Sequence, residues 1–399
     1  MISVQNARDI IESNTNPLPT IELPLSGSLF SILSHDMISP IASPPFAQSA
    51  MDGYAFEYSD LKIDIPIPIS GVVAAGSMDA HHLQKGTAMR IFTGAPMPMG
   101  ADTVIVQEMC TMEGDHVIFK DREIKQYVNV RPRASQVDKG DMVAAKGTKI
   151  TPALIGYMAS LGIDKLKVFS KPKIGIIVTG DELVQAGSML KHGQVYESNM
   201  AMLSALCSEL RLYVSYMCHT PDHLQTIYTS VKEALQTCDI LLMTGGVSVG
   251  DYDYVAKALE MNDVNTLFHK VAQKPGKPLY MGKYNQKIIF GLPGNPGSVL
   301  TCFYEYAVPC IRALSGYKNA FPKKNMVKIL NDYSKKQGLT HYIKAYNTLD
   351  GAHIVEGQES YKLNGFAQGN SLVEIGANIT QISAGDYVPL LMYDNILSI

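Results

Sequence analysis

A glycine-rich stretch followed by two aspartates, TGGVSVGDYD at residues 244–253, is the first feature of the sequence that indicates chemistry. Gly245 and Gly250 have the spacing of the two glycines in a phosphate-binding P-loop, but Asp251 stands where that motif requires a lysine. Backbone amides in a glycine-rich turn can bind a phosphate without a lysine. Clustered carboxylates favour a hard divalent cation, and Mg2+ is commonly held by one or two carboxylates together with substrate phosphate. The stretch therefore indicates a phosphorylated ligand bridged by Mg2+.

Three further loops occupy the same kind of position as this glycine-rich stretch, because each directly follows an apolar, strand-like run. They are TGDEL at 179–183, TPDH at 220–223 and LPGNP at 292–296. Ligands of an open parallel sheet bind beyond the C-terminal ends of its strands, so we expect all four loops at one edge of a sheet. Three of the loops carry carboxylates, namely Asp181, Glu182, Asp222, Asp251 and Asp253. Helices that follow such loops would present free N–H groups to an anion.

Each loop also has a purely structural interpretation. The run from Thr220 to Asp222 is a good helix start, and Asn295 is suited to cap a helix that begins at Pro296. Any single loop is more often structural than functional, because short motifs match by chance. Four such loops at one sheet edge favour the functional interpretation.

Residues outside these loops add further candidates. Lys274 and Lys277 flank a Pro-Gly turn in KPGKP and could bind an oxyanion, although surface lysines beside turns are common. Asp52 and Thr93 lie in Gly- and Pro-rich stretches, FAQSAMDGYAF and RIFTGAPMPMG, which taken alone are turns. The ten histidines show no HxH or HExxH spacing, so a transition-metal site built from imidazoles is not expected.

The elements that must position these residues alternate between strand and helix from about residue 171 to 314. The strand-like runs KIGIIV, LYVSYMC, DILLM and KIIFG are separated by amphipathic helical patterns, one around Leu203 and Cys207 and one around Ile227 and Val231. This alternation predicts a mostly parallel sheet covered by helices, the α/β class.

The regions on either side of this α/β segment are richer in short strand-like runs and turns. Short β-like runs such as IPIPI, TVIVQ and HVIF lie between residues 40 and 141, and a second β-rich unit with a hairpin at 340–357 follows residue 321. Ser3 is expected to cap a helix near the N-terminus, and a second helical pattern follows it, marked by Leu29, Ile32 and Leu33. Another helix is expected between Thr151, as its N-cap, and Gly162.

Composition describes an ordinary folded protein. The 399 residues suggest about two or three domains, and 46% hydrophobic with 18% charged residues argues against disorder. A net charge of -3 provides no basic field for nucleic acid or an anionic membrane. Neither a signal-peptide pattern nor an apolar run of roughly 18 residues occurs, so a cytoplasmic location is expected. The six cysteines form no CxxC pair and are expected to be reduced core thiols.

Six motifs occur in a fixed order along nearly the whole chain: SAMDGYA, RIFTGAPMPMGADTVIVQE, VTGDEL, TGGVSVGDYDYV, KPGKP and LPGNP. In this order they resemble molybdopterin molybdenumtransferases, the enzymes that insert molybdate in the last step of molybdenum cofactor synthesis, and the related E domain of gephyrin. The resemblance implies a multidomain α/β protein in four parts. These are an elongated segment (1–39 and 142–170), a β-rich domain (40–141), a molybdopterin-binding α/β domain (171–320) and a C-terminal β-barrel (321–399).

The resemblance also implies a reaction and a set of roles. Adenylylated molybdopterin and molybdate would react with Mg2+ to give molybdenum cofactor and AMP, in a homodimer whose site lies between the α/β domain of one subunit and the β-rich domain of the other. A molybdopterin adenylyltransferase is a candidate partner, whereas nucleic acid and membrane are not. The implied catalytic residues are Asp52, Thr93, Glu182, Asp222 and Asp253. The implied metal ligands are Asp251, Asp253 and Glu182. The implied binding residues are Gly245, Gly246, Ser248, Lys274, Lys277, Pro293, Pro296 and Ser298, with Lys274, Lys277 and Ser298 as candidates for molybdate.

Two regions depart from the family pattern. Ala134, Ser135 and Gln136 replace an acidic run, so the acid expected there is absent unless Asp138 or Asp141 substitutes for it. Lys344 stands near a position where relatives carry arginine, and a lysine cannot offer an oxyanion the bidentate fork of a guanidinium.

Two other functions stay open on the sequence. Adenylylation of molybdopterin would consume ATP, but the SAMDGYA region and the C-terminal β-rich unit argue against it, because that activity resembles a stand-alone α/β domain. A non-catalytic scaffold like gephyrin would have no need of the carboxylates at Asp52, Glu182, Asp222 and Asp253.

Overall fold

The computed structural model of the chain describes residues 1–246 and 254–394. The chain forms two compact units. Unit 1 consists of Met1–Glu22, Phe30–Ser34 and Lys167–Ile399, and unit 2 consists of Leu23–Leu29 and His35–Leu166. Of the helices within the described residues, none is long and apolar enough to cross a membrane.

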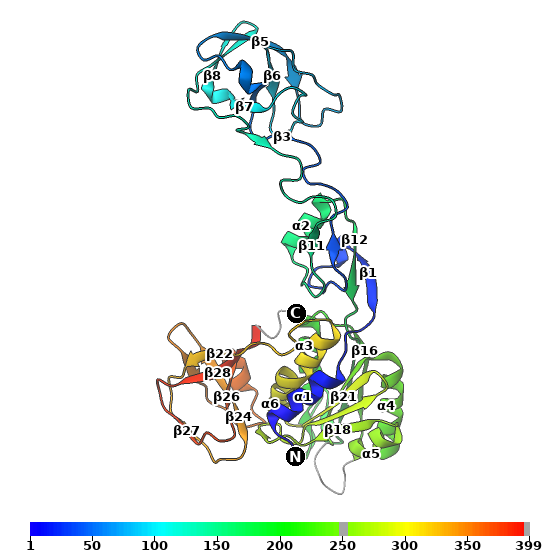
Figure 1. Cartoon of the computed structure of the whole chain (residues 1–399). Helices are drawn as coiled ribbons and strands as arrows, with labels where there is room; N and C mark the ends of the chain where they lie inside the picture. Colours follow the sequence, from blue (N-terminus) through cyan, green and yellow to red (C-terminus); the bar gives the residue numbers. More distant parts are fainter. Residues whose placement is uncertain (247–253, 395–399) are drawn as a thin grey trace. The chain divides into compact units, whose positions relative to one another are not determined.

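A six-stranded sheet with the order β16-β13-β17-β21-β20-β18 forms the centre of unit 1 (Figure 1). Its four parallel strands are those expected from the apolar runs: β13 (Ile174–Thr179), β16 (Val214–Thr220), β17 (Ile240–Thr244) and β21 (Lys287–Leu292). The other two strands, β18 (Asn265–His269) and β20 (Tyr280–Tyr284), are antiparallel. Neither contains a long apolar run, which is why hydrophobic pattern did not identify them.

Helices cover both faces of this sheet (Figure 1). Successive side chains of a strand point to opposite faces, and β13 shows this directly, because Ile176 and Ile177 belong to different hydrophobic clusters. The cluster of Ile176 includes side chains of α1 (Val4–Asn14), α3 (Asn199–Glu209), α6 (Pro296–Cys302) and α7 (Val308–Leu314). The cluster of Ile177 includes side chains of α4 (Leu224–Thr237) and α5 (Tyr254–Met261). The expected α/β layers are thus present.

The two helical patterns predicted near the N-terminus have different outcomes. Helix α1 forms as expected, with the Ser3 side chain accepting a hydrogen bond from the Asn6 amide. The second helix, expected around Leu29, Ile32 and Leu33, is wrong, because Leu33 forms a β-bridge with Val168. Ile32 and Leu33 are buried in this extended stretch. Their apolar spacing therefore reflects burial beside another strand rather than a helical face.

One continuous helical segment from Pro296 to Leu314 changes its hydrogen bonding midway. A π-helix, η4 (Phe303–Ala307), lies between α6 and α7. Pro309 has no N–H with which to bond the carbonyl of Glu305, four residues earlier, so the regular helical ladder is interrupted at this point. Glu305 itself is 3% exposed and needs a compensating charge.

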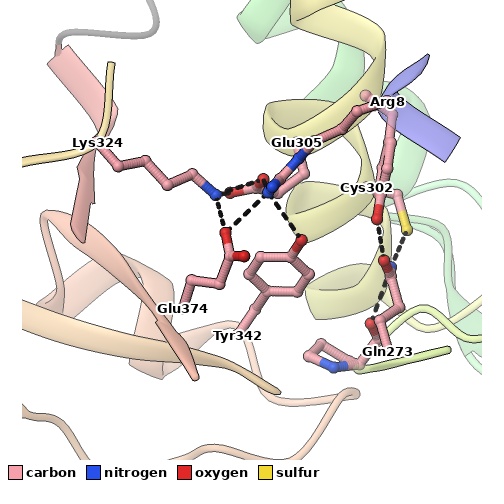
Figure 2. Close-up of polar contacts among 9 residues, drawn as sticks. Arg8, Gln273, Cys302, Glu305, Lys324, Tyr342 and Glu374 are labelled. Carbon is pink, nitrogen blue, oxygen red and sulfur yellow. Dashed lines mark hydrogen bonds and ion pairs between the residues drawn. The ribbon is translucent and has the colours of Figure 1, made fainter. Parts of the chain in front are cut away.

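That charge comes from a partly buried ionic cluster of Arg8, Glu305, Lys324 and Glu374 (Figure 2). Arg8 donates to Glu305 at 2.9 Å and to the hydroxyl of Tyr342 at 3.3 Å. Lys324 donates to both Glu305 oxygens, at 2.8 and 2.7 Å, and also to Glu374. The cluster joins the N-terminal helix, the π-helix and the C-terminal sheet by directional contacts.

The C-terminal part of unit 1 contains a second six-stranded sheet. Its path is β19-β24-β26-β28-β22, with β25 paired to β24. The strands are β19 (Gln273–Lys274), β22 (Asn325–Lys328), β24 (Thr340–Asn347), β25 (Ala352–Ile354), β26 (Ser371–Ile375) and β28 (Tyr387–Met392). The hairpin expected at 340–357 is confirmed as the antiparallel pair β24 and β25. Strands β23 (Tyr333–Ser334) and β27 (Gln381–Ile382) form a separate pair, and the helix α8 spans Asn364–Gln368.

Unit 2 is β-rich, as its turn-rich sequence predicts. A six-stranded sheet has the order β7-β4-β6-β5-β9-β8. Its strands are β4 (Gly53–Phe56), β5 (Pro66–Val73), β6 (Ala88–Ile91), β7 (Thr103–Val106), β8 (Cys110–Glu113) and β9 (His116–Phe119). Two short antiparallel pairs join β2 (Met37–Ile38) to β11 (Met142–Ala144) and β3 (Gln48–Ser49) to β10 (Val130–Arg131). Helix α2 (Pro152–Ser160) is capped by Thr151, as expected.

The structure also tests the expectation about the cysteines. All six cysteines are free thiols, as expected, and the core position is confirmed for four of them, whereas Cys110 and Cys218 are half-buried. Strands β1 (Thr20–Pro24), β12 (Lys165–Phe169), β14 (Leu183–Val184) and β15 (Val195–Tyr196) complete the described strands.

Candidate functional site

A cavity of about 970 Å3 lies at the C-terminal ends of the parallel strands of unit 1. The register of the sheet explains its position, because Thr179 of β13 pairs with Thr220 of β16, and Thr244 of β17 pairs with Leu292 of β21. The loops that follow these strands therefore begin at one edge. Three of the four predicted loops line the cavity, and its lining includes Thr179, Glu182, Thr244, Gly245, Pro293 and Pro296.

Gly245 brings the glycine-rich turn close to the neighbouring strand. Its φ is +89°, in the left-handed region that favours glycine, and a Cβ at this position would lie 2.3 Å from the carbonyl oxygen of Thr179. The next residue, Gly246, also has a positive φ, of +60°. Gly246 does not line the cavity, and a Cβ there would meet Val255 at 2.8 Å. Glycine at 245 is therefore required by a close backbone approach at the cavity wall.

The two lysines of KPGKP form another part of the wall. Lys274, Gly276 and Lys277 all line the cavity. The turn is fixed from beneath by the buried side chain of Gln273, which donates to the carbonyls of Pro275 at 3.2 Å and Gly276 at 3.3 Å. The hydroxyl of Tyr306, on the π-helix, donates in turn to Gln273 (Figure 2 shows Gln273 beside Cys302). The backbone that carries the two lysines is thus held by the Gln273 side chain, and Tyr306 holds Gln273 in turn.

The LPGNP turn carries Ser298 into the cavity wall at the start of α6. Asn295 occupies the N-cap position of this helix, but the expectation that its side chain caps the helix is wrong. The Asn295 amide instead donates to the hydroxyl of Ser360 at 2.8 Å. The Asn295 side chain does not cap the helix because Ser360 offers it another acceptor. Ser360 lies in the segment 355–362, which follows strand β25 and contacts the turn.

Polar groups at the strand ends are buried at this cavity. The Asn199 amide donates to the carbonyl of Gly294 at 2.9 Å, which ties α3 to the LPGNP turn. Within the described residues, the hydroxyl of Thr179 and the side-chain oxygen of Asn199 have no hydrogen-bond partner. Buried polar atoms are usually paired, so these two unpaired atoms, on residues that line the cavity, are exceptions.

The cavity lining contains both acidic and basic side chains. Glu182 and Glu197 line the cavity together with Lys274 and Lys277. Glu197 is partly committed, because one of its oxygens accepts a hydrogen bond of 2.8 Å from the Met200 amide. Across the part of the chain that the structure describes, no group of three or more His, Cys, Asp or Glu side chains could hold a metal ion. Carboxylate oxygens nevertheless suit Mg2+, which needs only one or two of them beside a phosphate.

A buried histidine lies beside the lysine turn. Lys274 is the register partner of His341, on strand β24. Burial, with the charges of Lys335 and Lys274 acting in the same direction, lowers the pKa of His341 to about 4. Its Nδ1 lies 2.8 Å from the hydroxyl of Tyr333. His341 is therefore neutral at neutral pH and adds no charge to the lysine wall.

Some predicted residues lie elsewhere. Asp222 does not line the cavity, and its backbone N–H donates to the Asp181 carboxylate at 3.1 Å. The helix start proposed for this loop is displaced, because Thr220 ends β16 and the N-cap of α4 is His223. Ser248, Asp251 and Asp253 lie outside the described residues.

Asp52 and Thr93 belong to unit 2, where they contact each other. One Asp52 oxygen accepts hydrogen bonds from both the backbone N–H and the hydroxyl of Thr93, each 2.7 Å long. The backbone bond, then the hydroxyl bond and the charge of Arg90, hold the pKa of Asp52 below its usual range. The SAMDGYA and FTGAP motifs thus present an organised carboxylate.

The region that replaces the family's acidic run also lies in unit 2. The backbone N–H of Gln136 donates to the carbonyl of Ser43 at 2.9 Å. Asp138 and Asp141 belong to one turn, in which the Asp141 carboxylate accepts the Asp138 amide at 3.0 Å. Asp138 also lies 3.6 Å from Arg133. Both acids are thus engaged in local structure.

Several lining residues were not predicted. They are Tyr196, Glu197, Asn199, Gln273, Gln358, Ser360 and Tyr361. The last three lie more than 60 residues after LPGNP in the chain, and no local motif marks them. Only Asn199 carried a usable signal, since a small polar residue in ESN precedes an apolar helical pattern.

Comparison with known proteins agrees with this architecture. The model of the MoeA N-terminal region (domain I and II) matches residues 2–162, and that of a probable molybdopterin binding domain matches residues 175–313. A molybdopterin molybdenumtransferase from Haemophilus influenzae is 33% identical to this chain over 100% of both sequences. The chain belongs to the molybdopterin molybdenumtransferase family.

Other members of the family extend the comparison. A molybdopterin molybdenumtransferase from Staphylococcus epidermidis is 30% identical over 99% of this chain and 96% of its own length. Two solved structures of a molybdopterin biosynthesis MoeA protein from Pyrococcus horikoshii give TM-scores of 0.85 and 0.83 at 27% identity. Both cover 98% of this chain, and it covers 99% and 100% of theirs. The fold of these MoeA structures therefore extends over nearly the whole chain.

Proposed function

We propose that this protein inserts molybdate into adenylylated molybdopterin and releases AMP, in a Mg2+-dependent reaction that yields molybdenum cofactor. The observation that carries the proposal is a single cavity in which Lys274 and Lys277 share the lining with Glu182 and Gly245. Two ammonium groups suit an oxyanion such as molybdate. A carboxylate beside a glycine-rich turn suits a phosphate group with its metal ion.

The proposed roles follow from the different chemistry of the lysines and of the glycine-rich turn in the cavity lining. Lys274, Lys277 and Ser298 would hold molybdate, whereas Gly245, Pro293 and Pro296 would border the pterin or phosphate. Gly246 and Ser248 belong to the same glycine-rich turn in the sequence and are proposed binding residues on that ground. Asp222 is proposed as a catalytic residue on the family resemblance alone.

Mg2+ would be held by Glu182 together with Asp251 and Asp253. The described part of this set fits the ion, because Glu182 supplies a carboxylate at the cavity. When bound, the ion would stabilise the negative charge that develops on the leaving phosphate. The chain's own contribution is to place the carboxylate and the lysines around one space and to close the glycine turn against β13.

Further parts of the proposal rest on the family. We propose a homodimer in which Asp52 and Thr93 serve the reaction, and the organised, exposed contact between them supports a functional role. A four-part subunit, a mostly parallel central domain and a C-terminal β-barrel are proposed on the same ground. The four parallel strands of the central sheet support the second of these. A cytoplasmic location and an interaction with a molybdopterin adenylyltransferase are likewise proposed.

The test is AMP release from adenylylated molybdopterin, measured with and without molybdate and Mg2+, alongside reconstitution of a cofactor-free molybdoenzyme. AMP release that requires both ions and yields active molybdoenzyme is the expected result. Consumption of ATP would instead identify adenylylation of molybdopterin. Binding of the substrate without either reaction would identify a scaffold.

Two sets of variants connect the reaction to the residues. Lys274→Gln and Lys277→Gln should raise the molybdate concentration needed for half-maximal AMP release, whereas Lys328→Gln, an exposed lysine outside the cavity lining, should leave it unchanged. Asp253→Ala should abolish Mg2+-dependent turnover while the fold is retained. Unchanged turnover in that variant would remove Asp253 from the mechanism.

A further inference from the structure

We infer that Lys344 is a positioning residue, which holds the segment 355–362 and, through Ser360, fixes the LPGNP turn at the cavity. Lys344 lies on β24 and is 1% exposed. It does not line the cavity itself. The inference deepens the proposed function, on which its kinetic part rests, because it concerns the shape of the same cavity.

The ammonium group of Lys344 is fully used within the protein. Its Nζ donates to the carbonyl oxygens of Gly357 at 2.5 Å, Lys362 at 3.0 Å and Glu359 at 3.2 Å. An ammonium has three N–H donors and no acceptor, so these contacts leave no donor for a ligand. Lys344 therefore acts on the backbone of one short segment and cannot at the same time bind an oxyanion.

A second contact fixes the same segment to β24. The side chain of Gln358 accepts from the Lys344 amide at 3.0 Å and donates to the Lys344 carbonyl at 2.8 Å. The same Gln358 amide donates to the carbonyl of Val355 at 2.7 Å. Both the backbone and the side chain of Lys344 are thus engaged with residues 355–362.

Glycines allow this segment to close around the lysine. Gly357 has a φ of +77°, and a Cβ on Gly365 would lie 2.8 Å from the carbonyl oxygens of Glu356 and Gly357 and 3.0 Å from the Lys344 Cδ. The space around the lysine is therefore filled by backbone. A side chain added there would displace the carbonyls that Lys344 binds.

The held segment carries one wall of the cavity. Gln358, Ser360 and Tyr361 all line it. Ser360 contacts the LPGNP turn twice, because its carbonyl accepts the Gly297 amide at 2.9 Å and its hydroxyl accepts the Asn295 amide at 2.8 Å. A Cβ on Gly297 would lie 2.8 Å from the Ser360 carbonyl oxygen, so the approach is close. The segment 355–362 is therefore held by Lys344 through the carbonyls of Gly357, Glu359 and Lys362, and through Ser360 it bonds the turn that leads to Ser298.

Amide hydrogen exchange of the ligand-free protein tests the positioning role without reference to the reaction. Lys344→Met keeps the aliphatic stem and removes the three donors. We expect faster exchange both in the segment 357–362 and at the Gly297 amide. Lys362→Met is the matched control, since the side chain of Lys362 pairs with Glu359 and lies over the Tyr361 ring at the surface, apart from the Lys344 contacts, and it should leave both unchanged. Unchanged exchange at Gly297 in Lys344→Met would overturn the inference.

A second variant covers the case in which Lys344→Met does not fold. Gly297→Ala disturbs the same contact from the other side, by crowding the Ser360 carbonyl. It should accelerate exchange in the segment 357–362. Normal exchange there, in a folded Gly297→Ala protein, would contradict the coupling between the turn and the segment.

Kinetics then separate positioning from simple destabilisation. Loss of a buried hydrogen-bond network that shapes the wall should raise the KM for adenylylated molybdopterin about ten- to a hundredfold, with a smaller change in kcat. The effects of Lys344→Met and Ser360→Ala on KM should be less than multiplicative in the double variant, because both act through one contact. Multiplicative effects would show that Lys344 does not act through the Ser360 hydroxyl, while the exchange experiment tests the carbonyl contact with Gly297. If the wild-type protein releases no AMP, the proposed function fails, while the exchange experiment still decides the positioning role.

Discussion

The carboxylate of Glu374 accepts a 2.8 Å hydrogen bond from the guanidinium of Arg8, 366 residues away in the chain. Glu305 and Lys324 complete a cluster of two cations and two anions that is balanced in charge. Burial alone would raise the pKa of Glu374, but the charges of Lys324 and Arg8 outweigh it and hold that pKa below its ordinary value. The contribution of Glu374 to the stability of unit 1 is therefore present only while its carboxylate is ionised.

Glu374→Gln should lower the free energy of unfolding by about 3–5 kcal/mol at neutral pH, the usual cost of breaking a buried ion pair. The folded pKa lies below the ordinary value of 4.5, so the contribution of Glu374 is fully present above that pH and is lost as the pH falls further. Urea unfolding between pH 7 and pH 3 measures this. The wild-type protein should lose stability more steeply than the variant at the acid end. Parallel curves would mean that Glu374 does not titrate with folding.

A second pH dependence should come from His341. Its folded pKa of about 4 lies below the ordinary value of 6.5, since burial, Lys335 and Lys274 all favour the neutral ring. The unfolded chain thus binds more protons between these values, and stability should fall as the pH decreases from 6.5 to 4. His341→Asn should flatten this slope in urea unfolding. Tyr333→Phe, which removes one hydrogen bond and keeps the burial, should retain it.

Two glycines with nearly identical φ angles allow strain to be separated from crowding. Gly245 has a φ of +89° and Gly187 a φ of +90°, but only Gly245 has a neighbour, the Thr179 carbonyl, where a Cβ would be placed. Gly187→Ala should cost about 1–2 kcal/mol, for the left-handed conformation alone. Gly245→Ala should cost clearly more and should also alter the cavity. Thermal unfolding of the two variants gives the comparison, and equal losses would show that the turn relaxes freely.

The contact between Asp52 and Thr93 can be tested by titration. Thr93→Val removes the hydroxyl bond and retains the backbone bond, so the pKa of Asp52 should rise part of the way toward its ordinary value. Thr93→Ser keeps both donors and should leave the pKa low. Carboxyl NMR resonances followed through an acid titration report the value directly. A pKa that does not move in Thr93→Val would show that the hydroxyl does not stabilise the carboxylate.

Local patterns predicted much of this molecule because the features concerned are local. Runs such as DILLM and KIIFG have no polar face and become the buried strands β17 and β21. Thr151 and Ser3 cap helices because the cap interaction spans only three residues. By the same logic, the loops after parallel strands could be assigned to one edge of the sheet.

Other features could not be predicted because they depend on contacts between distant segments. Asn295 has the right type and position for a helix cap, yet Ser360 offers its side chain another partner. Leu33 has helical spacing but forms a β-bridge with Val168. Lys344 has the charge of an oxyanion ligand, and only the structure shows that three carbonyls use its donors. In each case the tertiary partner overrides the local preference.

Strand β19 precedes β20 and β21 in the chain, but its partner is β24 of the C-terminal sheet, with Gln273 opposite Thr340 and Lys274 opposite His341. The two sheets of unit 1 are consequently not independent modules. A fragment ending near residue 320 would retain the central strands and lose the only strand that pairs with the lysine turn among those described. Recombination at that boundary, in evolution or in the laboratory, would exchange the strand that pairs with Lys274 at the start of the lysine turn. The lysine turn and the C-terminal sheet should therefore be inherited together.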